Sequence, residues 1–390
     1  MTQMFAGWPH FSEEEADAVK ATLLSNKVNY WTGEEGRQFE SEYAKFLGTK
    51  HAIALMNGTA ALELPLRMWG IGSGDDVVVT PRSFMASTSC VVTQGARPIF
   101  ADVDRDSGNI TAESIDSVLT PKTRAIVLVH LAGWPCEMDQ IMALAESKGI
   151  KVLEDCAQAH GATYKGQEVG SIGHAGAFSF CQDKIMTTGG EGGLFATDDE
   201  DVWRRAWSFK DHGKSYDAVF NRDHAPGFRW LCESFGTNWR MTELQATLGR
   251  IQLRRLPEWK SQRRRNGLTL ANVLRKLPGI RVPLPPQHSE HAFYRLYVYV
   301  DPDALRANWT RDRVIAAIAS QGVPCFHGSC SEIYLERAFE VTAFRPSIAL
   351  PMAKQLGDTS MAFLLHPTLG DEHMHRVAQV VGSVLAEAVR

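Results

Sequence analysis

Short apolar runs alternate with helix-like stretches through the first 180 residues, and this alternation constrains the fold more than any other feature of the chain. The runs are "HAIALM", "DDVVVT", "RPIFADV", "RAIVLVH", "IKVLEDC" and "AGAFSF". They lack strict polar–apolar alternation, which is typical of strands buried on both faces. Stretches before and between them have helical spacing. "SEEEADAVKATLLS" begins with Ser12 and Glu15, the pattern of a capping box, "EEGRQFESEYAKFLG" ends at Gly48, and "MDQIMALAESKG" also ends at glycine. We therefore predict an α/β fold with a mostly parallel sheet sandwiched by helices.

The pattern changes after about Leu253. "LPGIRVPLPPQHSEHAF" contains four prolines and reads as an exposed connection. It is followed by the alternating strand "YRLYVYV" and by the helix-like "TRDRVIAAIASQG". A chain of 390 residues is long enough for two domains. We predict a large domain over residues 1–255, with an N-terminal arm, and a smaller C-terminal α+β domain over residues 256–390.

Composition argues against several classes of protein. A net charge of −4 gives no support for nucleic-acid binding, which usually goes with a basic domain. The basic cluster "RRRN" at 263–266 lies in a helix-like, charge-mixed stretch, and we interpret it as a solvated helix face, with an anionic contact as the alternative. Seven cysteines without a CxxC pair predict neither a metal site nor a disulfide framework. The chain has no secretory signal and no apolar run of about 18 residues, so we expect a cytoplasmic protein that does not insert into membranes.

Polar residues follow three of the predicted strands. Gly58 and Thr59 open a helix after "HAIALM", where free N–H groups favour a phosphate; a tight strand-to-helix turn is the simpler alternative. Asp155 ends "IKVLED", at the edge where open α/β sheets bind ligands; a helix N-cap is the alternative. Ser179 and Lys184 lie at and just past the end of "AGAFSF". Lysine amines form Schiff bases with carbonyl compounds, whereas a surface loop lysine is the simpler alternative.

We interpret these groups as one site, because the carboxyl ends of parallel strands meet at one edge of a sheet. A phosphate site, a carboxylate, a hydroxyl and a lysine are what pyridoxal 5′-phosphate (PLP) requires. The glycines after the lysine, in "TTGGEGG", allow tight turns beside a bound cofactor, with plain loop flexibility as the alternative. His160, in the turn after Asp155, is interpreted as a residue that packs beside the site.

Motifs along nearly the whole chain resemble the DegT/DnrJ/EryC1/StrS family of PLP-dependent sugar aminotransferases. They are, in order, "NYWTGEEGRQFESEYAKFLGTKHAIALMNGTAAL", "TPRSFMAST", "VHLAGWPCEMDQI", "VLEDCAQAHGATYKGQEVGSIGHAGAFSF", "GTNWRMTELQATLGRIQL" and "FLLHPTL". The resemblance implies the aspartate aminotransferase-like fold type I.

The resemblance also implies a role for each matching residue. Lys184 matches the lysine that binds the cofactor covalently, and Asp155 matches the partner of its ring nitrogen; both are expected to be catalytic. Gln158 is expected to contact the ring hydroxyl, and Phe84 the face of the cofactor ring. The expected contacts to the cofactor phosphate come from Gly58, Thr59 and Ser179. Asn238 is expected to contact the phosphate of the cofactor in the neighbouring subunit. The last contact implies a homodimer with shared active sites.

The resemblance implies transfer of an amino group from L-glutamate to a keto-sugar carried on a nucleotide diphosphate, for amino sugars of surface polysaccharides or glycosylated metabolites. Arg240 and Lys214 are candidates for meeting the diphosphate. A PLP-dependent nucleotide-sugar dehydratase is one alternative, although its lysine-independent members carry histidine where this chain has Lys184. A PLP-binding regulator is another alternative, although no helix-turn-helix segment or basic extension is visible.

Overall fold

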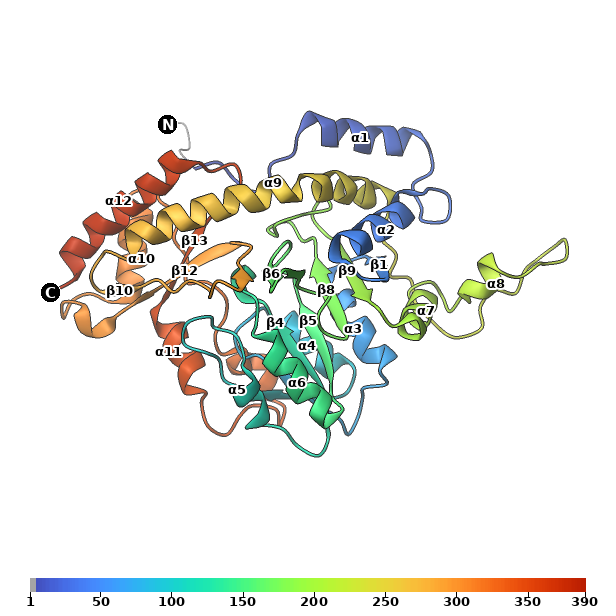
Figure 1. The fold of residues 1–390 in the computed structure, drawn as a ribbon, viewed down its shortest axis with the longest axis horizontal. Coiled ribbons are helices and arrows are strands. Elements are labelled where there is room, and N and C mark those ends of the chain that lie inside the picture. The colour runs from blue at the N-terminus through green and yellow to red at the C-terminus, as the bar shows by residue number, and fades with distance from the viewer. Residues whose placement is uncertain (1–4) are drawn as a thin grey trace.

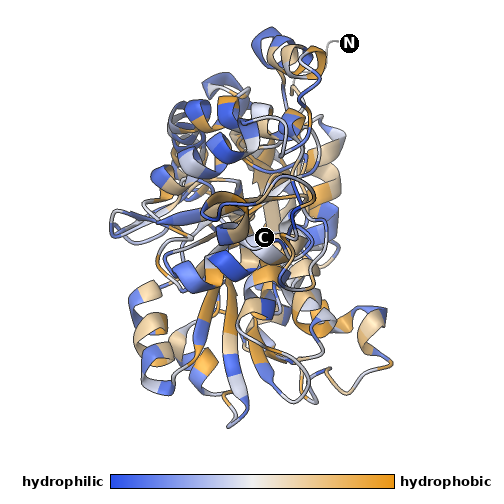
Figure 2. Ribbon diagram, turned by 90° about the vertical axis from the view of Figure 1, so that its right-hand side faces the viewer, coloured by the Kyte–Doolittle hydropathy of each residue, from blue (hydrophilic) through white to orange (hydrophobic). Residues whose placement is uncertain are grey.

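The computed structural model describes residues 5–390 and centres on a seven-stranded sheet (Figure 1). The strand order is β1-β9-β8-β5-β4-β2-β3, and all strands except β9 run in the same direction. Helices cover the sheet on both sides, and the strands form the apolar interior of this layered domain (Figures 1 and 2). The predicted mostly parallel α/β architecture is confirmed. The strands are β1 (His51–Leu55), β2 (Asp76–Val79), β3 (Arg97–Phe100), β4 (Thr123–Val129), β5 (Lys151–Asp155), β8 (Ala175–Ser179) and β9 (Gly193–Thr197).

Local sequence signals set the ends of the large-domain helices. Helix α1 (Glu13–Leu24) begins with the predicted capping box, in which the Ser12 hydroxyl accepts from the Glu15 N–H and Glu15 bonds back to Ser12. Helix α2 (Glu35–Leu47) ends at Gly48, whose φ of 78° is the left-handed conformation that favours glycine. The other helices here are α3 (Gly58–Met68), α4 (Ala86–Thr93), α5 (Ala112–Asp116), α6 (Met138–Lys148), α7 (Glu200–Phe209) and α8 (Tyr216–Phe220).

Strand β9 is the antiparallel element of this sheet, and it lies against the start of α3. A Cβ on Gly193 would lie 2.1 Å from the Asn57 carbonyl oxygen, so only glycine allows this approach. Within the same glycine-rich stretch, Gly190 has a φ of 122°. The glycines therefore let the chain return beside the β1–α3 turn.

The C-terminal part forms a second, antiparallel sheet with the order β10-β12-β13, made of Ile280–Arg281, Arg295–Val300 and Ser360–Leu364. It packs with α10 (Arg311–Ser320) and α12 (Asp371–Ala388) around an apolar cluster of its own. The long helix α9 (Glu243–Leu274) runs along both parts of the molecule (Figure 1). The boundary that we propose between residues 255 and 256 falls inside this helix. The remaining elements are α11 (Pro351–Thr359) and the short strands β6 (Thr163–Tyr164), β7 (Gln167–Glu168) and β11 (Ser289–Glu290).

The interpretation of 263–266 as a solvated helix face is wrong for Arg263 and Asn266, which are 1% and 0% exposed. The N-terminal segment covers this side of α9, and the Arg263 guanidinium lies 5.1 Å from the centre of the Trp8 ring. Its Nε and Nη2 atoms have no hydrogen-bond partner in the described chain. Burial lowers the pKa of Arg263 to about 9. A charge-mixed helix pattern does not show that a distant segment packs on one of its faces.

Candidate active site

Seven of the eight residues predicted to form the site line one cavity of about 430 Å³ at the carboxyl edge of the sheet. They are Gly58, Thr59, Phe84, Asp155, Gln158, Ser179 and Lys184. The ends of β5 and β8, the start of α3 and the segment before α4 bring them together. The eighth, Asn238, is exposed and does not line this cavity.

The α3 end of the cavity has the features of an anion site. Asn57 caps the helix by accepting from the Ala60 N–H at 2.9 Å. The N–H groups of Gly58 and Thr59 belong to the first turn, which has no partners within the helix. A Cβ on Gly58 would lie 2.6 Å from that of Ser179, so glycine lets β8 and α3 approach each other closely. Two open N–H groups, the helix dipole and the Ser179 hydroxyl therefore converge at one end of the cavity.

Asp155 is a buried carboxylate without a cationic contact in the described chain. One oxygen accepts from the Ser87 hydroxyl at 2.7 Å, and the other accepts from the Ala157 N–H at 3.1 Å. Burial raises the pKa of Asp155, although the Ser87 and Ala157 hydrogen bonds oppose the increase. A cation in the cavity would therefore stabilise the ionised form of this group.

The Gln158 side chain is held by the backbone. Its Oε1 accepts from the Ala132 N–H at 2.7 Å, which leaves the amide NH₂ group available to the cavity. Ala132 itself has a φ of 58°, an uncommon conformation for a residue other than glycine. The loop after β4 therefore fixes the orientation of Gln158.

His160 does not line this cavity, and protein groups lie within hydrogen-bond distance of both ring nitrogens. Its Nδ1 is 2.7 Å from the Tyr43 hydroxyl, and its Nε2 is 2.9 Å from the Ser179 carbonyl oxygen. Burial lowers the pKa of His160 to about 4, so the ring is neutral at physiological pH. These contacts agree with the prediction that His160 packs beside the site.

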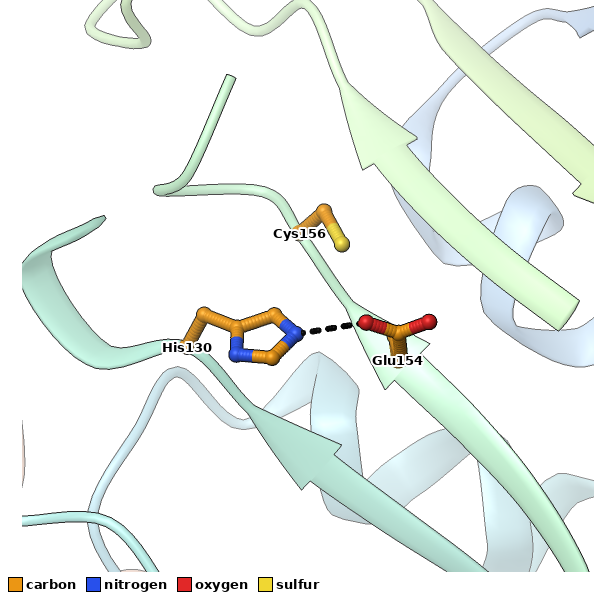
Figure 3. Close-up of side chains that lie close together, drawn as sticks. All are labelled: His130, Glu154 and Cys156. Atoms are coloured by element: carbon orange, nitrogen blue, oxygen red, sulfur yellow. Dashed lines mark hydrogen bonds and ion pairs between the residues drawn. The ribbon is translucent and has the colours of Figure 1, made fainter. Parts of the chain in front are cut away.

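A second buried group, formed by His130, Glu154 and Cys156, has the side-chain types of a metal site, and its last two members flank Asp155 in sequence (Figure 3). Hydrogen bonds account for its arrangement. His130 Nδ1 accepts from the Cys136 N–H at 3.0 Å, so Nε2 carries the proton and donates to Glu154 at 2.9 Å. The Glu154 carboxylate also accepts from three backbone N–H groups in the loop 170–173. The group therefore fixes the loop beside β5 and the end of the strand that carries Asp155.

Lys184 enters the cavity from the loop after β8. Its ammonium is 3.2 Å from Asp183 and 5.5 Å from the centre of the Tyr294 ring, and the Tyr294 hydroxyl donates to Asp183. Burial opposes the charge on Lys184, but Tyr294 and Asp183 outweigh burial and raise its pKa. The Lys184 carbonyl oxygen accepts from the Trp8 indole N–H at 2.7 Å, which ties the N-terminal segment to the lysine loop.

Arg240 and Lys214, the predicted candidates for a diphosphate, point elsewhere. Both bind the buried carboxylate of Asp211, at 2.6 Å and 3.0 Å. Neither lines the cavity that holds Lys184. Asn238 pairs with Asp211 through the backbone on the same surface. A single cation would neutralise the Asp211 carboxylate. The sequence therefore gave no reason to expect that Arg240 and Lys214 both pair with it.

The sequence reasoning missed four residues that shape the site: Trp8, Ser87, Asp183 and Tyr294. Ser87 had a usable signal, because it lies inside the motif "TPRSFMAST", which is expected at the cofactor. Asp183 directly precedes Lys184, so its contact was open to sequence reasoning as well. Trp8 and Tyr294 come from distant parts of the chain, and their spacing carries no signal for these contacts.

The fold and the lysine–aspartate cavity define an aminotransferase of the PLP-dependent class, and the comparisons agree. The model of the DegT/DnrJ/EryC1/StrS aminotransferase family matches residues 9–382, and the chain belongs to this family. It is 34% identical to the spore coat polysaccharide biosynthesis protein SpsC of Bacillus subtilis over 97% of this chain and 96% of that protein. It is 33% identical to the UDP-N-acetyl-3-dehydro-alpha-D-glucosamine 3-aminotransferase of Acidithiobacillus ferrooxidans, over 93% and 92% of the two chains.

The X-ray structure of the aminotransferase from Psychrobacter cryohalolentis superimposes with a TM-score of 0.97. The two chains are 58% identical, and the match covers 98% of this chain and 99% of that one. Within residues 5–390, no helix has the length and apolar character needed to cross a membrane.

Proposed function

We propose that the protein is a PLP-dependent nucleotide-sugar aminotransferase that takes its amino group from L-glutamate. The observation that carries this proposal is the single cavity in which a helix N-terminus, Asp155 and Lys184 face one another. The name of the Acidithiobacillus relative, which specifies a UDP-linked keto-sugar, supports the acceptor class. The name of the Bacillus relative supports a role in polysaccharide biosynthesis.

The cavity fits PLP by three features of this chain. The open N–H groups of Gly58 and Thr59, with Ser179, suit a phosphate. The buried carboxylate of Asp155, which lacks a cationic contact, suits a protonated ring nitrogen. Phe84 is 71% exposed at the cavity and offers a face to a planar ring. When bound, PLP supplies an aldehyde that captures amines and a ring that accepts an electron pair.

The residues then have separable tasks. The Lys184 Nζ would hold the cofactor aldehyde, and its free amine would carry the proton removed from the donor α-carbon. Asp155 would keep the ring nitrogen protonated, and Gln158 would orient the ring through its free amide group. Asp183 and Tyr294 hold the Lys184 side chain at the cavity.

We further propose a cytoplasmic homodimer with shared sites. All seven cysteines are unpaired, which suits a reducing compartment. The segment that carries α8 projects from the body (Figure 1), and Phe228, Trp230 and Phe235 on it are 78%, 81% and 101% exposed. This segment leads into Asn238, so burial of its aromatic side chains against a second copy supports a contact of Asn238 with the other site.

The test loads the protein with pyridoxamine 5′-phosphate and incubates it with UDP-, dTDP- and GDP-linked keto-sugars. We expect one of them to consume the pyridoxamine absorbance and to yield an amino sugar detectable by mass spectrometry. In the reverse preparation, borohydride treatment of the PLP form should place the label on Lys184. A product that has lost a hydroxyl group and gained no nitrogen would contradict the proposal and favour a dehydratase.

A further inference from the structure

A second cavity of about 270 Å³ adjoins the first and shares Lys184 with it. Residues of both parts of the chain line it, including Phe84 from the large domain and Ser329 from the segment after α10. Arg295, the first residue of β12, also lines this cavity. A substrate that reacts at Lys184 therefore has space on the side where Arg295 lies.

The guanidinium of Arg295 has no acidic group at contact distance within residues 5–390, although its charge acts on Asp183 at longer range. It makes no ion pair or hydrogen bond with any residue from 5 to 390, and its contacts are with the rings of Tyr294, at 5.2 Å, and Phe326, at 5.6 Å. Asp183 is engaged by Lys184 and Tyr294, and Glu336, which also lines the cavity, is not within ion-pair distance. By contrast, Arg240 and Lys214 are already neutralised by Asp211.

The position of Arg295 relative to Lys184 limits the ligand. The Lys184 ammonium and the Arg295 guanidinium contact the same Tyr294 ring, at 5.5 Å and 5.2 Å from its centre. In an amino acid, the α-carboxylate is one bond from the carbon that loses its proton. In a nucleotide-linked sugar, the diphosphate is separated from a keto carbon by several bonds of the sugar ring. An anion-binding residue this close to the reacting lysine, in a cavity this small, suits a carboxylate better than a diphosphate.

We propose that Arg295 binds the carboxylate of the amino donor and thereby sets donor specificity. The planar guanidinium matches a carboxylate with two parallel hydrogen bonds, and the flanking rings of Tyr294 and Phe326 hold the plane of the guanidinium. This inference rests on the proposed aminotransferase function. It adds the residue that distinguishes an amino acid from an uncharged amine.

The experiment separates the two halves of the reaction in the holoenzyme. Single-turnover mixing of the PLP form with L-glutamate measures the donor half, and mixing of the pyridoxamine form with the nucleotide keto-sugar measures the acceptor half. We expect Arg295→Gln to lower kcat/KM of the donor half by about 10- to 100-fold, mainly through KM, because charge-assisted hydrogen bonds are lost. Arg295→Lys, which keeps the charge and loses the two-pronged geometry, should be intermediate, and the acceptor half should change less than threefold in both variants.

A binding measurement avoids dependence on turnover. Glutarate has the carboxylates of glutamate but no amine, and calorimetry of the holoenzyme should detect its binding in wild type and a loss of at least tenfold in Arg295→Gln. Arg313→Gln is the matched control, because Arg313 lies on α10, stacks on Trp309 and lines neither cavity. Equal glutarate binding by wild type and Arg295→Gln would overturn the inference, as would a defect confined to the acceptor half, which would assign Arg295 to the diphosphate. Failure of the proposed function is distinguishable, because wild type itself would then yield no amino sugar.

Discussion

Replacing Ser87 with alanine tests whether Asp155 works as an ionised carboxylate. Ser87 donates one of the two hydrogen bonds that the chain supplies to this buried group, at 2.7 Å. A hydrogen bond to a charged group contributes about 1.5–3 kcal/mol, and removing one partner exposes the full desolvation cost of the other. The pKa of Asp155, which burial already raises, should therefore rise further in the variant.

Less of the ionised form means a weaker partner for a protonated ring nitrogen. We expect Ser87→Ala to raise the dissociation constant of PLP by about 10- to 150-fold and to lower turnover at saturating cofactor. Equilibrium dialysis with absorbance detection measures the first quantity, and single-turnover kinetics measure the second. The unfolding midpoint of the cofactor-free protein shows whether the fold itself has changed.

Thr88→Val is the matched control. Thr88 is the next residue on α4, it is fully buried, and its hydroxyl has no hydrogen-bond partner in the described chain. Valine keeps the shape of threonine and removes only that unpaired hydroxyl. PLP affinity within twofold of wild type in Ser87→Ala would refute the reasoning, and so would an equal loss in Thr88→Val.

Three further predictions concern the assembly, the N-terminal segment and pH. Asn238→Ala should weaken PLP retention and shift the proposed dimer towards monomer, because a ligand that bridges two chains stabilises the state that binds it; sedimentation of holo and cofactor-free protein across dilution checks this, and full PLP retention by a monomer would contradict it. Trp8→Phe keeps an aromatic ring near Arg263 but removes the N–H that Lys184 accepts, so amide exchange in residues 181–190 should accelerate with little change in the unfolding midpoint; unchanged exchange would show that the bond does not hold the loop. Burial raises the pKa of Glu168 from 4.5 to about 7, so the folded state keeps this proton at higher pH than the unfolded state and wild type loses stability as pH rises across that range. Glu168→Gln should therefore gain about 2–3 kcal/mol over wild type above pH 7 and little near pH 4; urea unfolding at both pH values tests this, and an equal gain at both would refute it.

Elements with a local cause could be predicted from the sequence. The capping box at Ser12 and the glycine end at Gly48 depend on neighbours within a few residues, and both are present as expected. The apolar runs predicted a mostly parallel sheet, because a strand buried on both faces has a continuous apolar sequence of its own. Strand β9 went unpredicted, since "GLFAT" is short and its direction depends on a partner that is distant in sequence, β1.

The residues of the candidate site also fall into a group that the sequence could predict and a group that it could not. The residues that line the main cavity lie at strand ends, and strand ends of a parallel sheet necessarily share an edge, so the pattern was enough to group them. The residues that hold them in place come from other parts of the chain. Tyr294 reaches Asp183 across 111 positions, and Trp8 reaches Lys184 across 176. No periodicity or spacing encodes such contacts, because they depend on how whole elements pack.

Arg263 shows why the rule for charged helices failed beside this site. Of the three consecutive arginines, Arg264 and Arg265 are exposed as expected, whereas Arg263 points about 100° away from its neighbour, to the side that the N-terminal segment covers. A buried guanidinium with two unpaired nitrogens is unfavourable, and the Trp8 ring offsets only part of that cost. The same Trp8 side chain donates to the Lys184 carbonyl oxygen, so the unfavourable burial and the position of Lys184 depend on one residue. Local rules are expected to fail where a chain accepts a stability cost to place the groups of a functional site, and Arg263 lies beside the candidate site.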